Sequence, residues 1–312
     1  MIAWTVVTAF AVAAPVAAWI YFRRFELMRP PIGVFDWHDV VFMLAAIVVV
    51  PIAYLALPRA VVGTILCLLA LNIFWFGLEP VLRYRSLIWP AAVGLVAADV
   101  VVNVTAPAGA SWVVALNDFE LVALAVFVTN MLAQSGMRAR DLAFLVSGLA
   151  VYDVVETTYL GLMGDLLRRL ATLPFAPLVA WRQGDWLAVG LGDLLIVVLA
   201  PLVLRKAFGR TAGLVAAVTS VGAVAGMLAA VRLDWFSRPI PAMVVLGPLL
   251  LLQYVLWRVR LGPERRTWEY LELEAPVRRV TREAVDATRE RPLLRRRGAL
   301  GPGTATAAIE RR

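Results

Sequence analysis

The 312-residue sequence has very little of the side-chain chemistry on which most enzymes rely. Its single Cys, Cys67, allows no internal disulfide, and its single His, His38, allows no His-rich or Cys-rich metal cluster. These counts exclude zinc-dependent membrane proteases and most thiol chemistry. They also argue against a serine protease built on Ser147, because the histidine base would have to come from a predicted loop beside Asp36 and Asp39.

Charge is also scarce, and it is unevenly placed. Only 17% of the residues are charged, 62% are hydrophobic, and the mean hydropathy is +0.80. Soluble domains are closer to half apolar and a quarter charged, and disordered chains are less hydrophobic still, so both classes are excluded. Of the 30 basic residues, 14 follow Trp257. A basic tail after an apolar body is typical of contact with anionic lipid rather than with nucleic acid.

The apolar body divides into runs that match the thickness of a bilayer. A helix needs roughly 20 apolar residues to cross it, and every backbone polar group in lipid must be bonded internally. We therefore predict an all-α polytopic membrane protein, with a nine-helix transmembrane domain over residues 1–260 and a basic, partly disordered tail over residues 261–312. The nine predicted spans are 2–22, 40–57, 60–78, 87–106, 111–134, 142–163, 186–204, 211–231 and 240–257.

The distribution of basic residues predicts the orientation. The first run has its charges, Arg23 and Arg24, after it rather than before it, which favours a retained helix over a signal peptide. With nine spans, the side that holds the N-terminus has 6 basic residues and the side that holds the tail has 24. The positive-inside rule then puts the N-terminus outside and the tail in the cytoplasm. Without a eukaryotic targeting signal, we expect a prokaryotic plasma membrane.

Six ionisable residues fall inside the predicted spans, and all of them are acidic. No Lys or Arg accompanies them in those spans, so they must be protonated, share a proton or face water. Carboxylates brought close together share a proton, which is the basis of aspartic protease chemistry. We expect some of the six to be structural. They are Asp99, Asp118, Glu120, Asp153, Glu156 and Asp193.

Three short patterns stand in order on the last spans. Tyr152-Asp153 lies in the sixth, Gly190-Leu191-Gly192-Asp193 in the seventh, and Pro241-Ala242-Met243 at the start of the ninth. The two glycines let another backbone approach Asp193 closely. The prolines predict irregular backbone, with unpaired carbonyls, beside a cavity or a partner.

These patterns resemble the YD, GxGD and PAL motifs of the presenilin and signal peptide peptidase family, the GxGD intramembrane aspartyl proteases. The resemblance covers residues 142–257 by motif, and the first five spans only by number and length. It implies nine helices, catalytic Asp153 and Asp193, and supporting roles for Tyr152, Gly190, Leu191, Gly192, Pro241, Ala242 and Met243. Met243 departs from the family's leucine but has a similar volume.

The resemblance implies hydrolysis of peptide bonds within transmembrane helices or signal-peptide remnants, without a metal or other cofactor. One carboxyl group would take a proton from water while the other protonates the scissile carbonyl. The predicted orientation matches the signal peptide peptidase branch, so we expect substrates with a cytoplasmic N-terminus. In the family, the connection corresponding to residues 165–183, which is predicted to be partly amphipathic and interfacial, can act as a substrate gate.

Other interpretations stay open. The same carboxylates suit a proton-coupled transporter or channel, although no internal repeat supports one. A third hypothesis is a family member that binds helices without cleaving them. Two further Gly-Asp pairs, Gly164-Asp165 and Gly184-Asp185, are predicted to be loop residues, and the GxxxG of Gly222 and Gly226 is predicted to pack against a helix.

Overall fold

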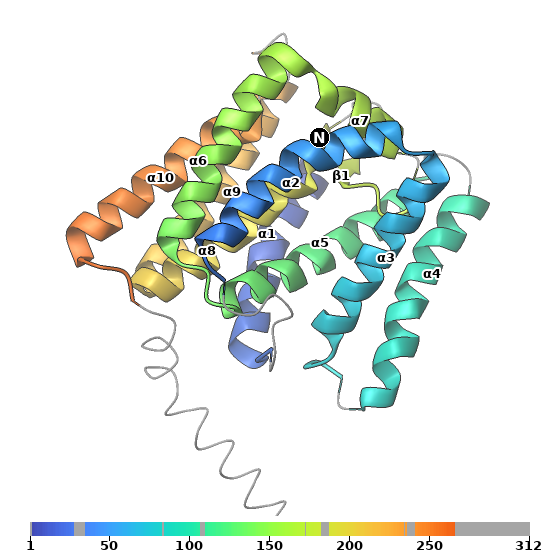
Figure 1. Cartoon of the computed structure of the whole chain (residues 1–312), viewed down its shortest axis with the longest axis horizontal. Helices are drawn as coiled ribbons and strands as arrows, with labels where there is room; N and C mark the ends of the chain where they lie inside the picture. Colours follow the sequence, from blue (N-terminus) through green and yellow to red (C-terminus); the bar gives the residue numbers. More distant parts are fainter. Residues whose placement is uncertain are drawn as a thin grey trace, which may run out of the picture. The chain divides into compact units, whose positions relative to one another are not determined.

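A computed structural model describes residues 2–27, 35–82, 84–106, 110–171, 173–181, 187–233, 235 and 241–265. The chain divides into two compact units, Met1–Glu264 and Arg265–Arg312. The first is a bundle of helices (Figure 1). The predicted tail lies outside the described residues from position 266 on, as do Gly184-Asp185 and Pro239.

The elements follow the apolar runs closely. The long helices are α1 (Ile2–Arg24), α2 (Trp37–Ala56), α3 (Arg59–Leu78), α4 (Ile88–Thr105), α5 (Ser111–Gln134), α6 (Ala139–Val155), α8 (Leu191–Phe208), α9 (Arg210–Arg232) and α10 (Ala242–Leu261). The shorter elements are η1 (Arg85–Leu87), η2 (Glu156–Leu160), α7 (Leu162–Leu170), β1 (Leu178–Trp181) and β2 (Leu187–Gly190).

Among the residues that the structure describes, seven helices are long and apolar enough to cross a membrane, which identifies a mostly helical, polytopic membrane protein. They cover Trp37–Ala56, Arg59–Leu78, Arg85–Thr105, Trp112–Gln134, Ala139–Leu160, Arg210–Arg232 and Ala242–Leu261. The predicted count of nine is therefore not reached. Helix α8 carries Asp193, Arg205 and Lys206, and the described side chains of α1 begin at Val7 and end in an Arg pair.

Helix α8 forms the centre of the bundle, between α5 and α9, with α1 against it (Figure 1). Nearly all of its side chains from Leu194 to Phe208 are buried. Helix α8 runs past the predicted end of the seventh span and includes two basic residues, Arg205 and Lys206. Lys206 is 2% exposed, and its Nζ donates hydrogen bonds to the carbonyls of Ala133 and Met137 at 2.9 and 2.7 Å, beyond the predicted end of that span.

The sixth predicted span is not one straight α-helix. Helix α6 ends at Val155, continues as the π-helical turn η2, and stops at Gly161, which has a φ of 62°. Helix α7 then buries Leu166 and Leu170 and exposes Asp165 and its ion-pair partner Arg168. The predicted partial amphipathic helix is present as α7, at the start of the connection, and Gly164-Asp165 belongs to this helix rather than to a loop.

The seventh predicted span begins with strand instead of helix. Residues 187–190 form β2, which pairs antiparallel with β1 from Leu178↔Gly190 to Trp181↔Leu187. Four-residue strands leave the all-α class unchanged, but they alter the approach to Asp193. The sheet ends where α8 begins, three residues before that carboxylate.

Candidate active site

Asp153 lies in the last turn of α6 and faces the start of α10. The backbone N–H of Met243 donates a hydrogen bond to Asp153 Oδ2 at 3.0 Å. The two residues belong to neighbouring helices, since α6 packs along α10 (Figure 1). The YD and PAL patterns, which are 90 residues apart in sequence, are therefore in direct contact.

The start of α10 explains why that N–H is available. Pro241 is the N-cap residue, so Ala242 and Met243 lie in the first turn, where backbone N–H groups have no partner within the helix. The positive end of the helix dipole also favours a carboxylate here. We expected the prolines to leave carbonyls unpaired, whereas the groups that matter are the N–H donors after Pro241.

Close packing between α6 and α10, one helical turn from this hydrogen bond, brings Met243 and Asp153 within reach of each other. A Cβ added to Gly247 would lie 2.7 Å from the Cβ of Ala150 and 3.0 Å from the carbonyl oxygen of Val146. Gly247 stands four residues after Met243, and Ala150 three residues before Asp153. A glycine at this point lets the two backbones approach, so the donor reaches the carboxylate. Sequence reasoning did not single out Gly247.

Asp193 lies in the first turn of α8 and is half-buried. The charge of Asp153 acts on it at Coulombic range, so the structure brings the two predicted catalytic carboxylates together from different helices. A Cβ at Gly190 would lie 3.3 Å from Asp193 Oδ2, tighter than an ordinary contact. Gly192 is exposed, with open space beside it. The first glycine makes room for the carboxylate, and the second leaves room for another chain.

Two more acidic or phenolic groups border this pair. Tyr152 is half-buried, and Glu156 is 8% exposed at the start of the π-helical turn. Both groups lie within Coulombic range of Asp153. A π-helical turn often marks a functional site, because its extra residue rotates the side chains that follow it. Leu191, Pro241 and Ala242 are half-buried at the two helix starts.

Side chains of α4 and α5 hold the segment that leads into the sheet. Asp99 is fully buried, and one of its oxygens accepts a hydrogen bond from the backbone N–H of Phe175 at 2.8 Å. Phe175 has a φ of 54°, an unusual value for an aromatic residue. Asn117 donates to the carbonyls of Ala176 and Leu178, both at 3.3 Å. Asp99 therefore has a structural role, as we expected for some of the six acidic residues.

The remaining predicted residues have different surroundings. Asp118 is 1% exposed and Glu120 is fully buried, and neither Glu120 oxygen has a hydrogen-bond partner in the described part of the chain. Asp99 lies within Coulombic range of Glu120. Among the described residues, the expectation that Gly222 and Gly226 pack against a helix is wrong, since a Cβ at either would meet nothing there within 4 Å.

Neither a scan of protein-family models nor a search of curated proteins finds a match to this sequence.

Proposed function

We propose that this chain is an intramembrane aspartyl endopeptidase of the presenilin and signal peptide peptidase type, with Asp153 and Asp193 as its catalytic residues. The observation that carries the proposal is the meeting of three helix ends. Two carboxylates within Coulombic range sit at the end of α6 and the start of α8, and the first turn of α10 donates a hydrogen bond to one of them. Only two carboxyl groups and a water molecule are needed for acid–base hydrolysis.

In the proposed reaction, one carboxylate removes a proton from water, whose oxygen attacks the scissile carbonyl carbon. The other carboxyl group donates a proton to the carbonyl oxygen. The tetrahedral gem-diol then collapses: one of its hydroxyl groups returns a proton to the dyad, the C–N bond breaks, and the amine leaves with a proton from the dyad, which regains its single shared proton. The two groups titrate as a unit, so the acid and base roles belong to the pair.

The substrate has to be extended at the scissile bond, because the peptide bonds of a helix are covered by its own hydrogen bonds and side chains. We place the extended segment along the free edge of the β1–β2 sheet, which ends at Gly190 beside Asp193. The open space at Gly192 supports this placement. Transmembrane helices or signal-peptide remnants with a cytoplasmic N-terminus are the proposed substrates.

The proposed architecture has nine crossings, with α1 and α8 added to the seven candidate spans. The charges of α8 lie near its ends, and its middle is covered by other helices, so it needs little lipid contact. Nine crossings put the N-terminus outside and the basic tail in the cytoplasm of a prokaryotic plasma membrane.

The test is cleavage of model transmembrane peptides of both orientations by the purified protein in liposomes. Wild type is compared with Asp153→Ala, with Asp193→Ala and with wild type plus an aspartyl-protease transition-state inhibitor. Asp165→Ala, which removes an exposed carboxylate of α7, is the matched control. We expect both dyad variants and the inhibitor to abolish cleavage and the control to retain it. Cleavage that persists in either dyad variant overturns the assignment.

A second candidate function is supported by one observation. Glu120 is a fully buried carboxyl group with neither oxygen hydrogen-bonded in the described residues, and Asp99 acts on it at Coulombic range. Intramembrane carboxyl groups without partners are typical of proton-coupled transporters. Proton flux into liposomes that Glu120→Gln removes, in a protein that cleaves no peptide, would favour this alternative.

A further inference from the structure

The two proposed catalytic carboxylates stand at the two ends of one segment of the chain, residues 154–192. The segment contains the π-helical turn η2, helix α7 and the β1–β2 sheet, in that order. Asp153 precedes it and Asp193 follows it. The way in which the rest of the bundle holds this segment therefore affects how the two carboxylates face each other.

The half of the segment nearer to Asp193 is held by α4 and α5, through the hydrogen bonds of Asp99 and Asn117 described above. The half nearer to Asp153 consists of η2 and α7, which meet at Gly161 with its φ of 62°. A π-helical turn followed by a left-handed glycine has little stiffness of its own. Its direction depends on what holds α7.

Helix α7 is held by the side chain of Arg169. The guanidinium group donates hydrogen bonds to the carbonyl oxygens of Leu55 and Leu57, at the end of α2. These carbonyls need a donor, because α2 ends at Ala56 and the following Pro58 has no N–H with which to continue the helix. The negative end of the helix dipole also favours a cation here. A guanidinium group can serve two carbonyls at once, whereas an ammonium group is a single point charge.

Apolar contacts complete this attachment. Leu166 and Leu170 of α7 are buried against Val62 of α3, and the half-buried Leu57 packs on the same cluster. Arg168, the neighbour of Arg169 in sequence, is exposed and pairs with Asp165 on the same helix. The two adjacent arginines of α7 therefore differ: one joins α7 to the end of α2, and the other stays on the surface of α7.

We propose that Arg169 is a positioning residue for the Asp153–Asp193 pair, an inference that rests on the proposed function. By fixing α7 to the end of α2, Arg169 fixes η2 and with it the last turn of α6, so that Asp153 keeps its direction toward Asp193. The proposed substrate site at the sheet and Gly192 is held by Asp99 and Asn117 instead. Loss of Arg169 should therefore impair the chemical step more than substrate binding.

The test compares Arg169→Met with Arg168→Met, which removes the same charge from the next position. Cleavage of a model transmembrane peptide is measured in liposomes, with full-length protein that elutes as a single species on size exclusion. We expect Arg169→Met to lower kcat about 10- to 100-fold, because small displacements of reacting groups are costly, and to leave KM within about threefold of wild type. Arg169→Lys should recover part of kcat. Arg168→Met should resemble wild type, because exposed ion pairs contribute little.

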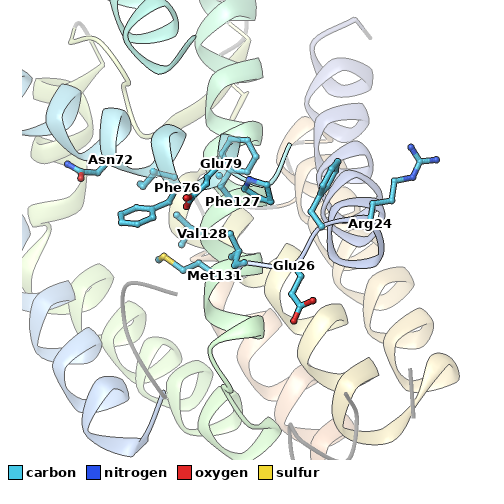
Figure 2. Close-up of a pocket in the computed structure, with 13 residues that line it drawn as sticks. Arg24, Glu26, Asn72, Phe76, Glu79, Phe127, Val128 and Met131 are labelled. Carbon is cyan, nitrogen blue, oxygen red and sulfur yellow. The ribbon is translucent and has the colours of Figure 1, made fainter. Parts of the chain in front are cut away.

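A second control separates positioning from a general loss of stability. A cavity of about 430 Å³ lies between the ends of α1, α3 and α5, and Met131 lines it (Figure 2). Its lining residues fall within 24–27, 72–80 and 127–131, away from the segment 154–192. Met131→Ala removes most of a side chain from this wall and should lower the thermal midpoint. At an equal loss of thermal midpoint, Arg169→Met should lose much more kcat than Met131→Ala.

The outcomes distinguish this inference from the proposed function. If wild type cleaves no peptide, or if Asp153→Ala still cleaves, the proposed function fails and the inference fails with it. If wild type is active and depends on both aspartates, three results overturn the inference alone. They are a normal kcat in Arg169→Met, a kcat loss no larger than that of Met131→Ala at equal thermal midpoint, and a raised KM with unchanged kcat.

Discussion

Two pairs of carboxyl groups that lie within Coulombic range, Asp153 with Asp193 and Asp99 with Glu120, have different surroundings. Asp153 and Asp193 are half-buried at helix ends, near the β1–β2 sheet and a glycine with open space. Asp99 of α4 and Glu120 of α5 are fully buried, and one oxygen of Asp99 accepts a hydrogen bond from the backbone N–H of Phe175. Under the proposed function, the pair at the helix ends, and not the fully buried pair, carries out the chemistry.

The largest difference between the pairs should be in activity. Asp193→Asn removes one proton-transferring group while keeping the side chain's size, so we expect cleavage to fall about 10²- to 10⁴-fold. The thermal midpoint should hardly change. Peptide cleavage and thermal unfolding of the same preparation measure both. An Asp193→Asn protein with near-normal cleavage would remove the contrast between the pairs.

The contact between α6 and α10 should be the next most sensitive feature. Gly247→Ala places a methyl group 2.7 Å from the Cβ of Ala150, so the helices have to separate and the Met243 donor moves away from Asp153. We expect a stability loss of about 1–3 kcal/mol and a cleavage loss of roughly 10-fold or more.

Gly222→Ala, at a glycine of α9 with nothing within 4 Å, is the control for Gly247→Ala. It should leave both quantities near wild type, because alanine favours a helix at least as well as glycine. If the two substitutions have equal effects on cleavage, close packing of α6 on α10 does not position the dyad.

For the pair of Asp99 and Glu120 we expect the opposite: substitution of Asp99 should affect stability more than cleavage. Asp99→Ala leaves the buried N–H of Phe175 without an acceptor, which costs about 1–3 kcal/mol. Asp99→Asn keeps an amide oxygen in place and should cost less. Thermal unfolding should rank the three proteins, from the most to the least stable, as wild type, Asp99→Asn and Asp99→Ala. Cleavage by the folded fraction should fall far less than in Asp193→Asn, and a loss as large would assign Asp99 to the chemistry.

The sequence predicted the helices well and the helix ends poorly. Apolar runs locate the long helices α1 to α6 and α8 to α10, because hydrocarbon thickness dictates the length of each run. The motifs also identified Asp153, Asp193 and Met243, which the fold brings to one end of the bundle. Hydropathy, however, cannot distinguish an apolar strand from an apolar helix, so residues 187–190 were predicted as helix.

Two features of the fold depend on tertiary contacts that no local pattern reveals. Gly247 resembles any other glycine in an apolar run until α6 is packed against it. Lys206 was placed beyond the end of its span, although the carbonyls at the end of α5 allow its charge to be buried. A motif search for small residues would have favoured Gly222 and Gly226, where an added Cβ would meet none of the described residues within 4 Å.

Glu120→Gln should have the smallest effect, and it sharpens the comparison further. Neither Glu120 oxygen accepts a hydrogen bond from the described residues, so a neutral amide of nearly the same shape loses no protein contact. It also removes a buried group whose charged form Asp99 opposes. We expect thermal stability within about 0.5 kcal/mol of wild type, or slightly above it, and unchanged cleavage. A marked loss of stability would mean that Glu120 is held by a partner outside the described residues. A loss of proton flux with cleavage absent throughout would instead make Glu120, and not the Asp153–Asp193 pair, the functional carboxylate of this protein.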